Sequence, residues 1–167
     1  MKLEPVSRPN LARAALGAAL IGAAAVAFAA MDGSAGPADA NDALAGAREH
    51  LVAKRWSAAI DELKRINAAD SANWNSLMGY ASRKQPTPDL AAAERFYDAA
   101  LRLEPKHRGA LEYSGELYLM KGDLARAEQR LQALDTACLL PCDEQRDLRQ
   151  AIERYKSNGN RQVQSTY

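Results

Sequence analysis

Small and apolar residues recur at helical spacing between Trp74 and Pro141, in two consecutive units of 34 residues. When the units are aligned from Trp74 and Arg108, apolar and small side chains fall at matching positions, and Ala93 lies opposite Ala127. Within each unit the pattern predicts two amphipathic helices joined by a short turn. Neither helix can bury its apolar stripe alone, so we expect the units to stack, with Ala93 and Ala127 buried where two backbones approach closely.

A third unit precedes these two, over residues 40–73. Its second half fits the pattern well, because Trp56 and Ala59 begin a stripe at helical spacing. Its first half carries a thinner stripe, as expected of a terminal unit with no neighbour on its outer side. At the other end, residues 142–156 predict a further amphipathic helix that covers the apolar end of the array. The polar residues 157–167 are expected to be disordered.

Proline marks the helix boundaries in the middle unit. Pro86 and Pro88 cannot continue a helix, so the first helix should end near Lys84. Thr87 is expected to cap the second helix, because its hydroxyl can accept an amide of the first turn. Pro88 then has the preset backbone angle of the first helical position, and Asp89 suits the positive helix end. The helices expected in the last unit are Arg108–Lys121, which ends in a turn at Gly122, and Leu124–Ala137.

The pattern resembles the tetratricopeptide repeat family, which has small residues at positions eight and twenty of its 34-residue unit and proline at position thirty-two. Ala81 and Gly115 occupy the eighth positions, Pro105 the thirty-second of the middle unit, and Gly122-Asp123-Leu124 is the most typical fragment. In the last unit Leu139 stands where proline is expected. The resemblance implies an all-α fold, a solenoid of about three helical hairpins. Its expected extent is residues 41–156, with units 40–73, 74–107 and 108–141 and a C-terminal capping helix at 142–156.

The first forty residues differ from the repeats. Lys2, Arg8 and Arg13 precede an uncharged apolar run from Ala14 to Met31, after which polar residues return. A basic start, an apolar middle and a small-residue exit are typical of a secretory signal peptide. We expect residues 1–40 to be a cleaved signal peptide with a short linker or, alternatively, a membrane anchor. The repeats would then be exported to the periplasm or, if anchored, held on the outer side of the inner membrane.

Charge and motif content exclude several function classes. The 167 residues include 22 basic and 21 acidic side chains, so no overall field attracts the chain to nucleic acid, and membrane contact is expected only through an uncleaved N-terminal segment. There is no phosphate-binding glycine loop, nucleophile elbow or paired histidine motif, so we expect no enzyme, no catalytic residue and no cofactor. His50 and His107 lie far apart in the array, and with two cysteines they are too few for a metal site.

Two cysteines, Cys138 and Cys142, flank Leu139-Leu140-Pro141 where the last repeat meets the capping helix. In an exported protein we expect a disulfide between them, which would stabilise the position of the capping helix by about 2 kcal/mol. The alternative is a thiol-dependent redox or assembly factor, because the start of a helix favours the thiolate of Cys142. Against it, thiol oxidoreductases have two residues between their cysteines, and Asp143 and Glu144 oppose a thiolate.

In the tetratricopeptide repeat family the first helices line a concave groove through their second, fifth, ninth and twelfth positions. The resemblance therefore implies a non-catalytic adaptor or scaffold that binds a protein or peptide partner, such as a peptide with a basic and an acidic end. A solvated groove without function and self-association through the first unit are the other readings. Glu112 and Glu116, four residues apart, could also bind a cation or a basic ligand. The positions carried over are Leu44, Arg48, Leu51, Asn75, Met78, Ser82, Glu112, Glu116 and Leu119.

Overall fold

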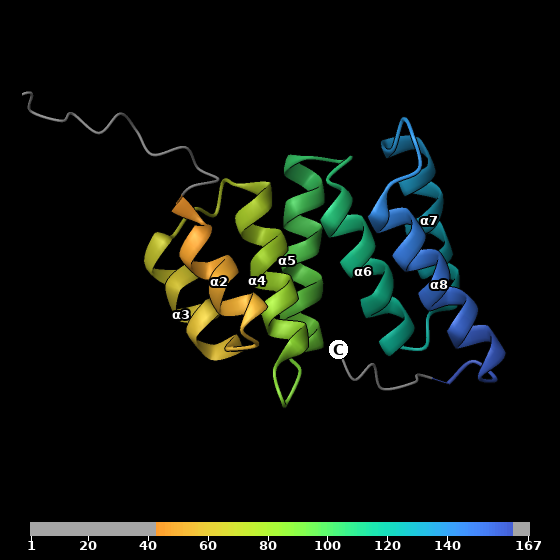
Figure 1. Cartoon of the computed structure of the whole chain (residues 1–167), viewed down its shortest axis with the longest axis horizontal. Helices are drawn as coiled ribbons and strands as arrows, with labels where there is room; N and C mark the ends of the chain where they lie inside the picture. The colour runs from red at the N-terminus through yellow and green to blue at the C-terminus, as the bar shows by residue number, and fades with distance from the viewer. Residues whose placement is uncertain (1–42, 162–167) are drawn as a thin grey trace, which may run out of the picture. The chain divides into compact units, whose positions relative to one another are not determined.

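The computed structural model describes residues 43–161 (Figure 1). It has seven α-helices and no strand in this range, which confirms the all-α prediction. The predicted leader, residues 1–40, and residues 162–167 of the predicted tail lie outside the described residues. No helix in the described range is long and apolar enough to cross a bilayer. The helices are α2 (Ala45–Val52), α3 (Trp56–Ile66), α4 (Ala72–Lys84), α5 (Leu90–Leu103), α6 (Arg108–Met120), α7 (Leu124–Ala137) and α8 (Asp143–Ser157).

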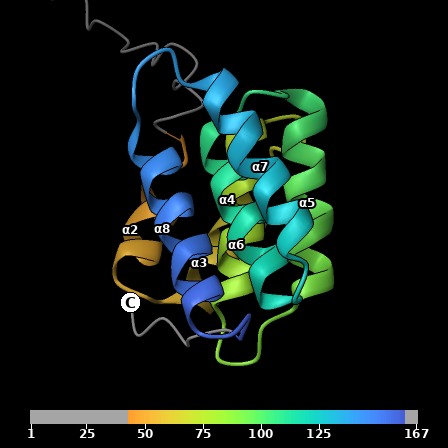
Figure 2. The same cartoon turned by 90° about the vertical axis from the view of Figure 1, so that its right-hand side faces the viewer.

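Each helix packs against its neighbours in the sequence. The pairs α2–α3, α4–α5 and α6–α7 are joined by short loops, and α3–α4 and α5–α6 contacts connect one pair to the next. α8 packs against both α6 and α7 (Figure 2). The buried hydrophobic clusters follow the same order, with two in α2–α4, one in α5 and α6, and one in α6–α8. The described core is therefore built from helices that are close along the chain.

The second helices of the three units recur with the period of the sequence. α3, α5 and α7 begin at Trp56, Leu90 and Leu124, so successive starts are 34 residues apart. The fourth residue of each of these three helices is an alanine, and all three alanines are fully buried. A side chain of this size allows neighbouring backbones to approach closely. The predicted burial of Ala93 and Ala127 is confirmed, and Ala59 shares it.

Aspartates cap two of the second helices. Oδ1 of Asp89 accepts the amide of Ala92 at 2.8 Å, and Oδ1 of Asp123 accepts the amide of Arg126 at 3.0 Å. The prediction that Thr87 caps α5 is wrong, because the helix begins only at Leu90. A carboxylate at the N-cap satisfies a free amide and also favours the positive helix end, whereas a threonine hydroxyl carries no charge.

His107 caps α6 and also contacts the preceding unit. Its Nδ1 accepts the amide of Ala110 at 3.0 Å, and its Nε2 lies 3.0 Å from Oδ1 of Asn73. These two contacts are compatible with a neutral ring that carries its proton on Nε2. Burial lowers the pKa of His107, which favours this neutral form. His107 is therefore a helix-end residue, and sequence spacing alone did not indicate its contact with Asn73.

Two glycines mark close approaches between helices. A methyl group at Gly79 of α4 would lie 2.6 Å from Cε1 of Tyr97 on α5, and one at Gly115 of α6 would lie 2.5 Å from Cδ2 of Leu148 on α8. Tyr97 and Leu148 are fully buried, so neither side chain has free space to move into. A third glycine, Gly122, has a φ of 77° and allows the turn between α6 and α7 that the sequence predicted.

Candidate functional site

Six of the nine predicted groove residues are buried. Met78, for example, packs with Trp74 in a core cluster, and Nδ2 of Asn75 donates to the carbonyl oxygens of Ala69 and Ser71 at 2.8 and 2.9 Å. These side chains support the helix pairs from within and offer little surface to a partner. The buried residues are Leu44, Leu51, Asn75, Met78, Ser82 and Leu119, and the partly exposed ones are Arg48, Glu112 and Glu116.

The side chains that are accessible on α4 and α6 include two of the predicted groove residues, Glu112 and Glu116, together with residues that were not predicted. The partly exposed positions recur three or four residues apart, so they lie on one side of each helix. Tyr80 of α4 and Tyr113 of α6 connect the two helices, with ring centroids 4.7 Å apart. We call this surface the α4–α6 face; it comprises Leu77, Tyr80, Lys84, Glu112, Tyr113 and Glu116.

Four aromatic rings, two of them on this face, contact one another in succession. The ring of Tyr80 lies 6.0 Å from Trp56 of α3 and 4.7 Å from Tyr113, which in turn lies 6.4 Å from Tyr97 of α5. The ammonium group of Lys84 lies 5.8 Å from the centroid of Tyr80, within the range of a cation–π contact. Burial raises the pKa of both Tyr80 and Tyr113, so their hydroxyls stay neutral and able to donate a hydrogen bond.

Arg83 links α4 to α6 below the face. Its side chain is 5% exposed, and its Nη2 donates to Oε2 of Glu116 at 2.5 Å. Its guanidinium also lies 5.6 Å from the ring centroid of Tyr80 and interacts electrostatically with the buried hydroxyl of Tyr97. Loss of either partner of a buried ion pair leaves an uncompensated charge. Arg83 therefore fixes how the second and third units meet and positions Glu116 on the face.

Four carboxylates interact electrostatically where α6 meets α8, namely Glu112, Glu116, Glu144 and Asp147. Within residues 43–161, Glu112 is the one of these four that has neither an ion pair nor a hydrogen bond. Burial, reinforced by its three acidic neighbours, raises the pKa of Glu112 to about 8. The other ion pairs are Glu116 with Arg83 (2.5 Å), Glu144 with Arg108 (3.8 Å) and Asp147 with Arg146 (3.0 Å).

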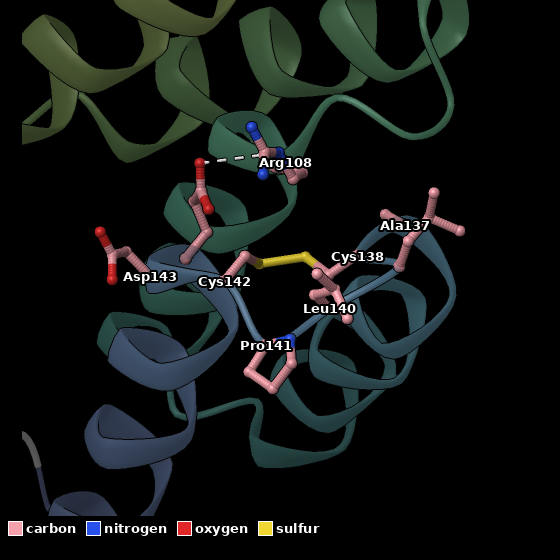
Figure 3. A pocket seen from close by; sticks show the side chains of 9 residues that line it. Arg108, Ala137, Cys138, Leu140, Pro141, Cys142 and Asp143 are labelled. Carbon is pink, nitrogen blue, oxygen red and sulfur yellow. Dashed lines mark ion pairs between the residues drawn. A yellow bond between two sulfur atoms is a disulfide. The ribbon is translucent and has the colours of Figure 1, made fainter.

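The predicted disulfide is present beside this cluster. Cys138 and Cys142 are bonded, with Cα atoms 6.1 Å apart, and the bond joins the end of α7 to the start of α8. The loop that it closes exposes Leu139 and Leu140, at 98% and 80%. Figure 3 shows the hollow beside the loop, with Arg108 of α6 on its other wall. The bond therefore positions the start of α8, and with it Glu144 and Asp147.

The two tyrosines of the face were not among the groove positions predicted from the sequence. Those positions were taken from the family pattern. Sequence neighbours do not distinguish Tyr80 and Tyr113, because the buried Tyr97 and Tyr155 also lie next to charged residues.

No three His, Cys, Asp or Glu side chains of residues 43–161 converge as a metal site requires. The sequence matches no protein-family model, and no curated protein matches it at a significant level. A function for this chain is therefore inferred from the α4–α6 face and the groups around it.

Proposed function

We propose that this chain is a tetratricopeptide-like array of three helical hairpins and a capping helix that binds a polypeptide partner on the α4–α6 face, without catalytic activity. The single observation that supports it most directly is the 34-residue period of α3, α5 and α7, with Ala59, Ala93 and Ala127 equally buried. Stacked pairs of this kind have their first helices on one side, where they form an extended surface.

The chemistry of the α4–α6 face suits a polypeptide. Tyr80 and Tyr113 offer large, rigid contact area with few rotatable bonds, and their hydroxyls can donate hydrogen bonds to a peptide backbone. Lys84 of α4 adds a positive charge, and Glu112 of α6 adds a carboxyl group that becomes negative as the pH rises through about 8, its raised pKa. Aromatic anchors beside charged groups are typical of residues that dominate binding energy at protein interfaces.

Site-directed photo-crosslinking in the source cells tests this proposal. We expect p-benzoylphenylalanine at Tyr80 to form adducts with one or a few polypeptides, because the ring lies on the face. The same group at Arg95, an exposed position of α5, is the matched control and should give none of these adducts. Equal adducts at both positions, or none at position 80, would refute binding at this face. An adduct of twice the chain mass would identify a second copy as the partner.

We also propose that the chain is exported to an oxidising compartment, where the disulfide is permanent. The support is that both cysteines of the sequence are used in this one bond. Thiol labelling of protein from fractionated cells, with and without reductant, should find no free thiol before reduction. Thiols that react without reductant would contradict a permanent bond and favour the alternative function of a thiol-dependent redox or assembly factor.

A further inference from the structure

The carboxylates beside the α4–α6 face are unequally compensated. Glu116, Glu144 and Asp147 each form an ion pair with an arginine of this chain, whereas Glu112 forms none within residues 43–161 and interacts with Arg83 only at longer range. Glu112 is nevertheless partly buried and interacts electrostatically with these three carboxylates. A carboxylate in such a position is unfavourable when ionised unless a positive group approaches it. The α4–α6 face therefore has a carboxylate at Glu112 that a positive group of a partner could pair with.

The aromatic side chains beside Glu112 suit a cationic occupant. Glu112 directly precedes Tyr113 on α6, and the ring centroids of Tyr113 and Tyr80 lie 4.7 Å apart. Both tyrosines also interact electrostatically with the Glu112 carboxylate. The ring of Tyr80 already lies within 6 Å of two cationic groups of this chain, at 5.6 Å from Arg83 and 5.8 Å from Lys84. A lysine or arginine side chain can place its charge near a carboxylate while its methylene stem lies on an aromatic surface.

We propose that the Glu112 end of the α4–α6 face binds a lysine or arginine side chain of the partner polypeptide, held by the Glu112 carboxylate and the rings of Tyr80 and Tyr113. This inference rests on the proposed function and specifies its partner as a segment with a basic residue at the anchoring position. A metal ion is a poorer occupant, because no three acidic, histidine or cysteine side chains of the described residues converge as a metal site requires.

Oriented peptide libraries test the proposal with defined probes. Three biotinylated nonapeptide libraries carry a fixed central residue, lysine, glutamate or methionine, with mixed residues elsewhere. The full chain is incubated with each library at pH 8.5, and the retained peptides are quantified and sequenced. The lysine library should be retained at least about fivefold more than the other two, a preference of about 1 kcal/mol, as expected for one charge-assisted contact. Glu112→Gln should abolish this preference, and Glu153→Gln, on an exposed position of α8, should keep it.

The pH dependence of retention adds a readout that a purely structural role would not change. The groups that face Glu112 are Tyr80 and Arg83 of α4, Tyr113 and Glu116 of α6, and Glu144 and Asp147 of α8. With a pKa of about 8, Glu112 is ionised in about 1% of molecules at pH 6 and in about 90% at pH 9. Retention of the lysine library should therefore rise at least about fivefold over this range in the parent chain and change little in Glu112→Gln.

The outcomes separate this inference from the proposed function. Peptides retained equally from all three libraries, or a lysine preference that survives Glu112→Gln, would overturn the basic-residue inference and leave peptide binding standing. Selective retention of the glutamate library would also overturn it and would place the anchor on Lys84. If no library is retained by the parent chain, the binding function itself fails, and the inference fails with it.

Discussion

Substitution of Glu112 by glutamine should change how the stability of the chain depends on pH. The pKa of Glu112 is raised from 4.5 to about 8 in the folded chain, first by burial and then by Glu116, Asp147 and Glu144. Between these two pH values the folded state holds a proton that the unfolded state has released. Folding is therefore favoured at the acidic end, and the free energy of unfolding should fall as the pH rises through about 8.

The size of the effect follows from the same shift. At 1.36 kcal/mol per pKa unit, a change from 4.5 to about 8 corresponds to about 5 kcal/mol. Water still reaches the partly exposed carboxylate, and solvent screening reduces the expected contribution to about 2 kcal/mol. Glutamine has nearly the same shape and no charge, so Glu112→Gln should be about 2 kcal/mol more stable than the parent at pH 9. At pH 4.5, where Glu112 is protonated, the two should be nearly equally stable.

Urea unfolding of the full chain at pH 4.5, 7 and 9, followed by circular dichroism, measures this difference. Other groups that titrate over this range, such as His107, are shared by the two proteins and cancel in the comparison. Glu153→Gln, an exposed substitution on α8, should follow the parent at every pH. If the stabilities of parent and Glu112→Gln differ by the same amount at pH 4.5 and pH 9, the pKa of Glu112 is not raised in the folded chain.

Three further experiments test the packing and the disulfide. Gly79→Ala places a methyl group 2.6 Å from the buried ring of Tyr97 and should lower the free energy of unfolding by about 1–3 kcal/mol. The control, Gly109→Ala, meets no atom closer than 3.6 Å and should be neutral or stabilising. Comparable losses of stability in the two variants would contradict the close approach of α4 and α5. Ala127→Leu should lower thermal stability by a similar amount, and an unchanged melting temperature would show that α7 has space there. Replacing both Cys138 and Cys142 by serine should lower the free energy of unfolding, measured in urea, by about 2 kcal/mol and preserve peptide retention. Loss of peptide retention without loss of stability would favour the thiol-dependent function.

The repeat pattern predicted the helices well because their signals are local. The range expected for the second helix of the last unit, Leu124–Ala137, is that of α7. Gly122 has the positive φ that the turn before this helix needs. The buried alanines were predictable because a 34-residue period places them at equivalent points of each unit. The capping residue of α5 was not predictable, since Thr87 and Asp89 are both good capping residues. The choice between them depends on the backbone conformation around Pro88 at the start of the helix.

The accessible face was less predictable, because exposure depends on contacts that are distant in the sequence. Asn75 and Met78 become buried as α4 packs against α3 and α5, although family positions place both on the groove side. The surroundings of Glu112 depend on α8, more than thirty residues later, which brings Glu144 and Asp147 next to it. Spacing within one helix indicated the Glu112–Glu116 pair, but it could not show which of the two finds an arginine.

The order of the hydrophobic clusters has a consequence for folding kinetics. Each cluster is completed by helices that follow one another directly, and none of the four joins α2 or α3 to α7 or α8. Chains whose contacts are this local fold quickly, on the order of microseconds to milliseconds, because little loop entropy is lost before contacts form. If such a polypeptide leaves a narrow channel with its N-terminus first, α2, α3 and α4 can pack together before the remaining helices have emerged.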